Sequence, residues 1–434
     1  SRRFAPNPKP LLIPETSSTS NCNVPILIMF RSRIKLGRSW NCHQPTKDDV
    51  EVLMTSRGVT RSRMNILLVH VWFWPHVGGG DRHVELLGKE LVARGHNVTV
   101  WCADVPRHDE REFTRHGVKV VRIPASRVLG GVDPVVSLGD LDPGEFDVVH
   151  LHDTLPILIR SVAKKASRIG VPIVTTYHND YVKKTLSGKF IKWLRWQIQG
   201  KHTLGLSDKI IVLRPYFSRL LASKGIRKEP LVVPTGFEPP EKTDSRPHDV
   251  SEAPFFLFLS RLTEQKGVDI LLQAWDQLAE EKRSGHKLIL AGDGPMRKHV
   301  ETAAGSDPES ILYLGLVDEE EKSWLLRNAT GLILPSRYEG LPAILLEAAW
   351  EGLPVAMSNV NGLGNFTEES GFGVSFTPND VDSCTKAISE IINAKPERKH
   401  DWAESGRVIA ATYLWPEVAS RIEDIYESVV RHTP

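Results

Sequence analysis

The chain has 434 residues, of which 41% are hydrophobic and 25% are charged, so it is long enough for two globular domains and is neither disordered nor fibrous. The net charge of +2 is uneven, because residues 1–63 hold 11 Lys or Arg and 4 Asp or Glu, which leaves 44 against 49 elsewhere. A mildly acidic body disfavours nucleic acid as a partner. No apolar run approaches the roughly 20 residues that span a bilayer. The four cysteines, Cys22, Cys42, Cys102 and Cys384, show no close pairing, so we expect a cytoplasmic protein.

The first 63 residues are rich in Ser, Pro, Asn and Arg and show no sustained hydrophobic period, so we expect a disordered or non-native extension. A regular pattern begins at Met64 with the sequence MNILLVHV, which is typical of a buried strand. Three interpretations of the first segment stay open. It is translated upstream sequence before a natural start at Met64, a transit peptide poor in acidic residues up to Lys47, or a disordered tail.

From Met64 onward, short apolar segments alternate with amphipathic helical patterns, which indicates parallel sheets covered on both faces. The expected helices of the first half include Arg82–Arg94 and Thr154–Ile169. The expected strands of the first half are NILLVHV, NVTVWC, VKVVRI, DVVHLH, PIVTTYH and KIIVL. The second half repeats the pattern with FFLFLS, KLILAG, ILYLG, GLILP, PVAMS and GVSF.

This repetition predicts an α/β protein with two Rossmann-like parallel-sheet domains that face each other across a cleft. We place an N-terminal domain at 64–238, a polar linker with four prolines at 239–254, and a C-terminal domain at 255–412. Residues 413–434 contain an amphipathic helix that we expect to pack across the domain junction.

A run of three glycines, Gly78, Gly79 and Gly80, follows the first expected strand and precedes a helix. Ligands of doubly wound sheets bind at the carboxyl ends of strands, beside helix N-termini. Glycine lets a ligand approach the backbone closely, so the run is a candidate binding element.

Polar side chains also follow two later strands of the first half. His150, His152 and Asp153 end one strand, and Tyr177 and His178 end the next. Several polar rings at neighbouring strand ends favour a functional site. We expect no metal there, on the reasoning that the histidines of a His-x-His pair point to alternate sides of a strand and that no further ligand cluster follows.

The second half carries charged residues at the same kind of position. Arg261 and Lys266 follow the strand FFLFLS, and a pair of cations at a strand end suits a diphosphate. The turn AGDGP, which contains Gly292, follows KLIL. After GLIL, the largely apolar stretch PSRYEGLPAILLEAAWEGLP contains Glu339 and Glu347, and carboxylates are seldom buried without a partner.

These motifs together resemble the retaining glycosyltransferases of family 4, which belong to group 1 and have the two-domain GT-B fold. The matching features are the glycine run, HLHD, TYH, SRLTEQKG, AGDGP and PSRYEG…E…EGLPV, in family order and over the chain from about Met64 onward. One departure is VVPTGFE, in which Thr235 and Glu238 stand where the family more often has Asn and Asp.

The resemblance implies a set of catalytic and donor-binding side chains. Arg261 and Lys266 would neutralise the donor diphosphate, and His152 would lie beside the donor sugar. Glu339 would bind hydroxyls of that sugar, and Glu347 those of the ribose. Ligand hydroxyls would then satisfy both glutamates in place of protein partners.

The resemblance implies two further groups of residues. One group binds the donor mainly through its backbone, and the other lies on the acceptor side. On the acceptor side the resemblance implies Asp153, Tyr177 and His178. Pro342 suits a first helical position. The resemblance implies that no metal is required, and the nucleotide sugar counts as a substrate and not as a cofactor. The donor-binding backbone positions are Gly78, Gly79, Gly80, Gly292, Gly340, Leu341 and Pro342.

The segment between Asp180 and Asp208 is basic and amphipathic, with no acidic residue. One interpretation is a helix at Lys183–Lys201 that lies on an anionic membrane surface, at the inner face, and serves a lipid-linked acceptor. The other is a helix that packs on the sheet and has solvated cations. The cations are Lys183, Lys184, Lys189, Lys192, Arg195 and Lys201.

The sequence therefore predicts an enzyme of the hexosyltransferase type, active in polysaccharide or glycolipid biosynthesis. It would move a hexose from a UDP- or GDP-linked sugar to a glycan or a lipid-linked acceptor. A GT-B-fold nucleotide-sugar epimerase and an inactive nucleotide-sugar-binding protein are the alternatives. A dinucleotide oxidoreductase is disfavoured because GxGxxG is absent after the first strand.

Overall fold

The computed structural model describes residues 62–431 apart from 77, 130–132, 179–185 and 242–243. The predictions for 1–63 therefore lie almost wholly outside the described residues. No helix in the described part of the chain combines the length and the apolarity needed to cross a bilayer.

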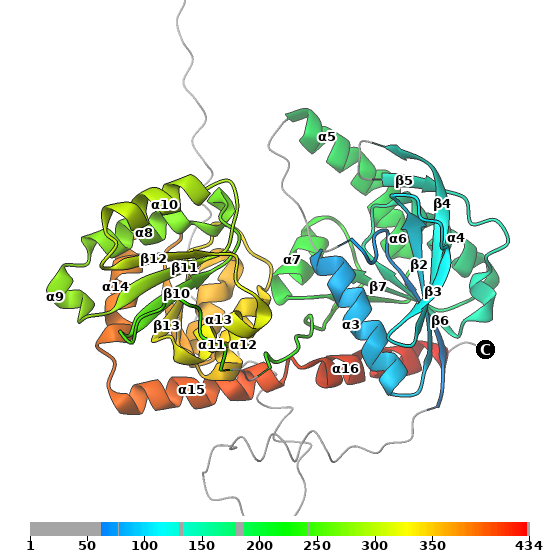
Figure 1. Cartoon of the computed structure of the whole chain (residues 1–434). Coiled ribbons are helices and arrows are strands. Elements are labelled where there is room, and N and C mark those ends of the chain that lie inside the picture. The colour runs from blue at the N-terminus through cyan, green and yellow to red at the C-terminus, as the bar shows by residue number, and fades with distance from the viewer. Residues whose placement is uncertain (1–61, 77, 130–132, 179–185, 242–243, 432–434) are drawn as a thin grey trace, which may run out of the picture. The chain divides into compact units, whose positions relative to one another are not determined.

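Nine strands from the first half of the described chain form one sheet in the order β3-β4-β2-β1-β6-β7-β8-β9, with β5 also paired to β4 (Figure 1). All pairs are parallel except those of β4 with β3 and β5. The six predicted strands are confirmed, and the short β3, β5 and β9 were not predicted. The strands are β1 (Asn65–Val69), β2 (Asn97–Asp104), β3 (Glu112–Arg115), β4 (Val118–Leu129), β5 (Asp133–Val136), β6 (Val148–His152), β7 (Ile173–Tyr177), β8 (Lys209–Val212) and β9 (Leu231–Val232).

The second half forms a fully parallel six-stranded sheet in the order β12-β11-β10-β13-β14-β15. All six strands predicted for this half are confirmed. They are β10 (Phe255–Leu259), β11 (Lys287–Ala291), β12 (Ile311–Gly315), β13 (Gly331–Leu334), β14 (Val355–Ser358) and β15 (Gly373–Phe376).

Helices connect the strands in both halves (Figure 1). The two predicted helices of the first half are confirmed with shifted starts, as α3 begins in the glycine run and α4 begins after Pro156. The first half has α3 (Gly79–Ala93), α4 (Ile157–Ile169), α5 (Leu186–Arg195), α6 (Lys201–Leu206), α7 (Pro215–Ser223), the 3-10 turn η1 (Pro143–Glu145) and the π-helical turn η2 (Trp196–Gly200). The second half has α8 (Val268–Gln277), α9 (Glu280–Arg283), α10 (Arg297–Ser306), α11 (Glu319–Asn328), α12 (Ala343–Glu351), α13 (Leu363–Glu369), α14 (Val381–Ile392), α15 (Pro396–Ala411), α16 (Trp415–Val430) and the 3-10 turns η3 (Glu264–Lys266) and η4 (Val360–Gly362).

Each sheet is buried on both faces, as continuous apolar strands require. In β1, Ile66 and Leu68 join one hydrophobic cluster, whereas Leu67 and Val69 join another. The alternation follows from the two-residue period of a strand, which sends successive side chains to opposite faces.

The strand order reverses once in each sheet. The chain moves outward from β1 through β2 to β4, then returns to β6 on the other side of β1. In the same way β10, β11 and β12 lie on one side and β13 on the other. Such reversal points leave a crevice at the carboxyl ends of the two central strands, which is where ligands of doubly wound sheets bind.

The last helix, α16, belongs to the core of the first sheet. Val418, Ile422 and Tyr426 pack in the same cluster as residues of β1 and α3, and α16 lies beside α3 (Figure 1). Just before α16, Leu414 pairs with Phe237 in an isolated parallel bridge. The chain therefore passes between its two halves at two adjacent points.

A buried polar contact also fixes α16. Glu423, which is 1% exposed, places Oε1 2.7 Å from Nε2 of His96. The backbone N–H of Met64 donates to the other ring nitrogen of His96 at 3.2 Å, so Nε2 carries the proton and donates to the carboxylate. Arg94 lies 3.3 Å from the second carboxylate oxygen.

Truncation of α16 at its buried face tests this packing. Ile422→Ala is expected to lower the free energy of unfolding by about 2–5 kcal/mol, because it removes a fully packed side chain. Ile169→Ala is the matched control, since Ile169 is 48% exposed. Urea unfolding followed by circular dichroism measures both, and equal small losses in the two variants contradict the packing of α16 described here.

Candidate active site

The candidate residues lie at the two reversal points of strand order. The Gly78–Gly80 run follows β1, and His152 ends β6. In the second sheet, Arg261 and Lys266 follow β10, and Glu339 follows β13. Residues far apart in the chain thus meet where doubly wound sheets bind ligands.

Two glycines let the loops of the second sheet pack closely. Gly267 has a φ of 70°, and a Cβ added there would lie 2.0 Å from the carbonyl oxygen of Pro335. Gly292 has a φ of 129°, and its added Cβ would lie 2.0 Å from the carbonyl oxygen of Ser260. Only glycine fits either position without strain. The first contact places Lys266 beside the loop that follows β13.

Glu339 is buried and has protein partners. Its Oε1 accepts hydrogen bonds from Nζ of Lys266 and, at 3.0 Å, from the hydroxyl of Ser336. By contrast, Arg261 is exposed and makes no side-chain hydrogen bond or ion pair with another described residue. One predicted cation is therefore neutralised by a carboxylate, and the other faces solvent.

The backbone at the start of α12 is held from the first half of the chain. Arg214, which follows β8, donates to the carbonyl of Gly340 at 3.0 Å and to that of Asn361 at 2.7 Å. The side-chain amide of Asn361 donates to the carbonyl of Glu339 at 2.8 Å. A Cβ added at Gly340 would meet nothing within 4 Å, so its backbone is accessible.

Two further predicted residues lie at this helix start. Pro342 is the N-cap of α12, with φ −71° and ψ 131°, and not the first helical residue as predicted. Leu341 is partly buried against the apolar core of the second half. Both residues position the backbone that follows Glu339.

Glu347 of α12 is largely buried, with its side chain 12% exposed, and faces Lys322 of α11, whose Nζ lies 3.1 Å from Oε2. Burial raises the pKa of the Glu347 carboxyl above its usual range, and the ammonium of Lys322 opposes this shift only in part. Burial lowers the pKa of Lys322, but the carboxylates of Glu347 and Glu319 outweigh it and leave that pKa raised. Each carboxylate therefore has a lysine as a protein partner, which the sequence did not lead us to expect, and its contact with ligand hydroxyls stays a prediction.

The glycine run forms the first turn of α3, with Gly78 as N-cap. A Cβ at Gly78 would lie 2.9 Å from Oδ2 of Asp81, and one at Gly80 would lie 2.9 Å from Nε2 of His70. A Cβ at Gly79 would meet nothing within 4 Å. Two of the three glycines are thus explained by close packing inside the protein, and Gly79 alone presents open backbone.

Asp81 is the anchor of this turn. Its Oδ1 lies 3.0 Å from Nε2 of His70, and its Oδ2 contacts Nδ1 of His76. Burial alone would raise the pKa of Asp81, but the hydrogen bonds to the two histidines lower it below its usual range. The carboxylate is therefore ionised at neutral pH.

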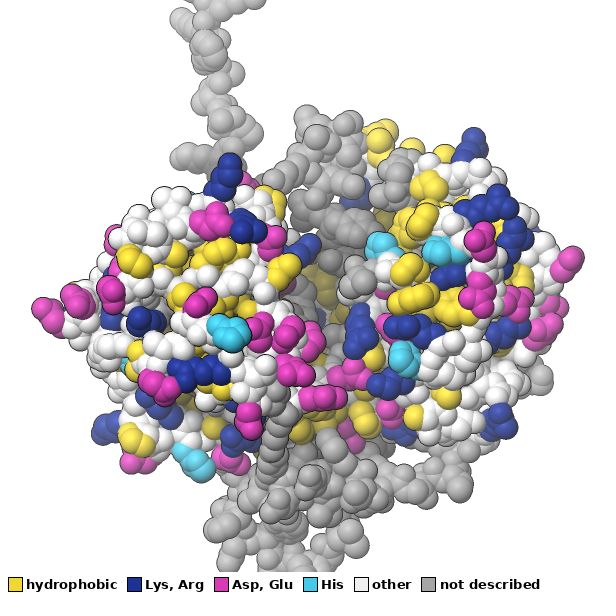
Figure 2. Space-filling model, in the orientation of Figure 1, with side chains coloured by type: hydrophobic (Ala, Val, Ile, Leu, Met, Phe, Trp, Pro, Cys, Tyr) yellow, Lys and Arg dark blue, Asp and Glu magenta, His cyan; other side chains and the backbone are white. Residues whose placement is uncertain are grey.

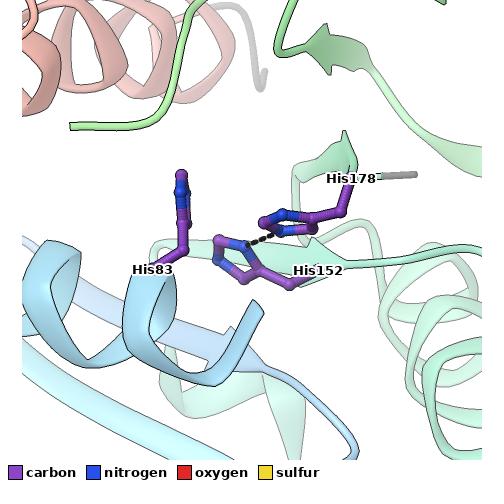
Figure 3. Close-up of side chains that lie close together, drawn as sticks. All are labelled: His83, His152 and His178. Carbon is purple, nitrogen blue, oxygen red and sulfur yellow. Dashed lines mark hydrogen bonds between the residues drawn. The ribbon is translucent and has the colours of Figure 1, made fainter. Parts of the chain in front are cut away.

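Histidines gather at the ends of β6 and β7. His150 and His152 have ring centroids 4.1 Å apart, so they lie on the same side of β6. The sequence-based reasoning that they point to alternate sides was wrong, because residues i and i+2 of a strand share a face. Nδ1 of His152 lies 3.1 Å from Nε2 of His178, and His83 of α3 completes the group (Figure 3). The expectation that no further potential ligands accompany His150 and His152 was also wrong, because His83 and His178 lie beside His152.

These histidines are neutral at neutral pH. Burial lowers the pKa of His83 and of His150 to about 3 in each case. Burial, together with the neighbouring rings, lowers the pKa of His152 and of His178 well below the usual range. Each ring thus has one N–H donor and one nitrogen lone pair.

The two other acceptor-side residues differ in where they point. Asp153 has a φ of 98°, its Oδ1 accepts from the backbone N–H of Thr154 at 2.6 Å, and burial raises its pKa. Tyr177 packs in the core, with its ring centroid 6.2 Å from that of Trp196 and 5.8 Å from that of Phe217. The ring of Tyr177 therefore points away from His152 and His178. This is expected, because consecutive residues of a strand such as Tyr177 and His178 point to opposite faces.

Several residues of the site were not predicted. Asp81 and His83 directly follow the glycine run, so the sequence GDRHVEL carried a local signal that was missed. Arg214 and Lys322 had no such signal, because each reaches its partner only through the tertiary fold.

Comparison with solved structures defines the class of fold. The sucrose-phosphate synthase of Thermosynechococcus elongatus aligns with a TM-score of 0.65 at 19% identity, over 85% of this chain and 100% of that one. The Anabaena protein HepE, in complex with UDP, aligns with a TM-score of 0.63 at 17% identity, over 84% and 100%. The fold is the GT-B fold, as predicted.

Family models then identify the chain. The model described as "Glycosyltransferase Family 4" matches residues 77–239, and "Glycosyl transferases group 1" matches 241–408. The phosphatidyl-myo-inositol mannosyltransferase of Mycobacterium leprae is 26% identical over 371 residues, which are 81% of this chain and 93% of that protein. The chain belongs to the group 1 glycosyltransferases of family 4 and is an enzyme that uses a sugar-nucleotide donor.

Removal of the lysine that faces Glu347 tests their pairing. Lys322→Met is expected to lower the free energy of unfolding by about 3–5 kcal/mol, because it leaves a buried carboxylate without a counter-ion. Lys386→Met, at an exposed position of α14, is the matched control. Addition of Glu347→Gln to Lys322→Met is expected to restore part of the loss.

The same variant has an expected pH dependence. Loss of Lys322 raises the pKa of Glu347 further, and an acid with a raised folded-state pKa loses stability as pH rises from its unfolded to its folded pKa. The deficit relative to the unmodified protein should therefore shrink as the pH is lowered from 7 toward 5. A deficit that stays constant or grows on acidification contradicts the assignment.

Proposed function

We propose that this glycosyltransferase transfers a hexose from a UDP- or GDP-linked donor, with retention of anomeric configuration. The observation that carries the proposal is the meeting of Lys266 and Glu339 at the reversal point of the second sheet. A cation and a carboxylate there match the two parts of a nucleotide sugar that meet at the reacting carbon, the diphosphate and the sugar hydroxyls. The UDP bound to the similarly folded HepE supports a uridine nucleotide.

Donor binding would change the partners of Lys266. A diphosphate offers more charge to Nζ than the single carboxylate of Glu339 does, and Arg261 is exposed and ready to share it. Glu339, released from Lys266 but still bonded to Ser336, would accept hydrogen bonds from hydroxyls of the sugar. The open backbone at Gly340 and the loop at Gly292 would lie along the donor.

The transfer step breaks the bond between the anomeric carbon and the diphosphate oxygen and forms a bond from that carbon to the acceptor oxygen. The acceptor proton passes to the departing diphosphate on the same face, so the sugar keeps its configuration. Lys266 and Arg261 stabilise the charge that develops on the diphosphate, which is the main contribution of preorganised cations. His152, neutral and buried, would orient a sugar hydroxyl. The step uses no metal cofactor.

The first half supplies the acceptor side and, we propose, a membrane contact. Five large apolar side chains of α5 and η2 are 41–61% exposed, and Figure 2 shows hydrophobic side chains at the surface near α5. A helix packed on the sheet would bury them, so the interpretation as a sheet-packed helix does not account for them. They are Phe190, Ile191, Trp193, Leu194 and Ile198.

One cation of this segment is engaged inside the protein. Arg195 is tied to the carboxylate of Asp133 and to the carbonyl of Leu155. Lys183 and Lys184 lie outside the described residues. The five exposed apolar side chains carry the proposed contact, and a lipid-linked acceptor follows from it, as the name of the mannosyltransferase relative also suggests.

Truncation of Lys266 tests the diphosphate assignment. Lys266→Ala is expected to reduce transfer and hydrolysis of a radiolabelled nucleotide sugar by about 100-fold or more, because it removes a charge aimed at the leaving group. Lys386→Ala is the control, and circular dichroism checks that both variants fold. Unchanged turnover in Lys266→Ala would contradict the assignment of Lys266 to the donor diphosphate. An isomerised sugar as product indicates an epimerase instead, and binding without turnover indicates an inactive binder.

The membrane contact is tested with vesicles. Trp193→Ala is expected to weaken binding to anionic phosphatidylglycerol vesicles about tenfold or more, because a buried aromatic side chain contributes well over 1 kcal/mol. Trp74→Ala is the matched control, since Trp74 is also exposed but lies after β1. Sedimentation measures both, and equal binding by the two variants contradicts the contact.

A further inference from the structure

Three imidazoles from separate segments converge at the carboxyl edge of the first sheet (Figure 3). His83 comes from α3, His152 from the end of β6 and His178 from the residue after β7. One nitrogen from each lies within 4.8 Å of the others. His83 is 3% and His152 0% exposed, so water satisfies these rings poorly.

Hydrogen bonding separates these three rings from the other histidines nearby. His150 uses both nitrogens, one with the hydroxyl of Tyr426 at 2.7 Å and one with that of Thr176 at 2.8 Å. His70 is also fully engaged, with the carbonyl of His152 and the carboxylate of Asp81. Neither ring has a lone pair left for a ligand.

The cluster itself contains orphaned atoms. Nε2 of His83 and Nε2 of His152 are buried and have no hydrogen-bond partner among the described residues. A buried polar atom without a partner costs about 1–3 kcal/mol, and each such atom in a native protein calls for an explanation. The free Nε2 of His83, which belongs to a cluster of three histidines, points to a ligand that accepts nitrogen lone pairs.

The distances suit a small cation with nitrogen ligands. Tetrahedral zinc with Zn–N bonds of about 2.0–2.1 Å places its ligand nitrogens about 3.3 Å apart. Nδ1 of His152 and Nε2 of His178 hydrogen-bond to each other at 3.1 Å, a separation close to one edge of that tetrahedron, so an ion bound through these two nitrogens would replace this hydrogen bond. The other separations are at most 4.8 Å, so a bound ion would draw the three rings closer together.

One ligand is also oriented as metal-bound histidines usually are. Nδ1 of His83 lies 2.9 Å from the hydroxyl of Thr235, which leaves Nε2 as the free nitrogen. Metal-binding histidines commonly hold their other nitrogen to an oxygen in this way, which fixes the ring. Thr235 is also one of the positions at which this chain departs from the usual family turn.

We propose that His83, His152 and His178 bind one Zn²⁺-type ion, with water as the fourth ligand. Three neutral imidazoles are a set that prefers zinc, cobalt, nickel or copper to magnesium or calcium. The ion is not a cofactor of the transfer. The ion occupies a nitrogen lone pair of His152, so His152 can no longer orient the sugar hydroxyl and bound Zn²⁺ slows sugar transfer. This inhibition rests on the proposed function, whereas the binding of the ion does not.

The binding test uses Co²⁺ as a spectroscopic probe and protein without a histidine tag. One Co²⁺ per chain is expected, with the intense visible absorption of tetrahedral coordination, and one equivalent of Zn²⁺ should displace it. His83→Gln should weaken Co²⁺ binding more than tenfold, and His299→Gln, an exposed position in α10, should leave it unchanged. Thr235→Val should weaken it about tenfold, because it removes only the hydrogen bond to the ligand ring.

Two outcomes overturn the site. One is a stoichiometry of less than one tightly bound Co²⁺ per chain. The other is an equal affinity of His83→Gln and His299→Gln for Co²⁺. If His83→Gln does not fold, as judged by circular dichroism, His178→Gln and Thr235→Val decide in its place. Nucleotide-sugar turnover in the presence of a chelator tests the proposed function separately. Turnover unaffected by Zn²⁺ at full occupancy overturns the inhibition and leaves the site standing.

Discussion

The ion pair between Lys266 and Glu339 joins the two loops at the reversal point of the second sheet. Its geometry depends on Gly267, whose positive φ and missing Cβ let the loop after β10 rest on the carbonyl of Pro335. A buried charge needs a partner, and here the partner of each group is the other. The site thus holds a cation and a carboxylate in close contact, and in the proposed reaction a ligand with stronger charge and suitable hydroxyls separates them.

The carboxylate of Glu347 is also paired with a lysine, and this pair has a structural role. Glu347 is held by Lys322, and both lie on helices packed side by side, so this pair fixes α12 against α11. The backbone between the two glutamates is steadied by Arg214 from the first half of the chain. Contacts from both halves therefore converge on the short segment from Glu339 to Glu347, and its position depends on how the halves pack.

Much of the fold was predictable because periodicity is a local property. Every strand predicted for the two sheets was found, whereas β3, β5 and β9 are too short or too polar to show a pattern. Sequence spacing also predicted that Lys266, Glu339 and His152 lie at strand ends. The lysine partners of the two glutamates and the three-histidine cluster were not predicted, since each is created by segments that meet only in the folded chain. The relation of His150 to His152 was predictable from strand geometry and was misjudged.

We infer that donor binding makes Lys266 exchange Glu339 for the donor diphosphate. A crystal structure of the protein with a bound uridine diphosphate sugar tests this most directly. We expect Nζ of Lys266 within hydrogen-bond distance of the diphosphate, and the carboxylate of Glu339 turned to the hydroxyls of the sugar. A diphosphate bound elsewhere, with the Lys266–Glu339 pair intact, would contradict this exchange.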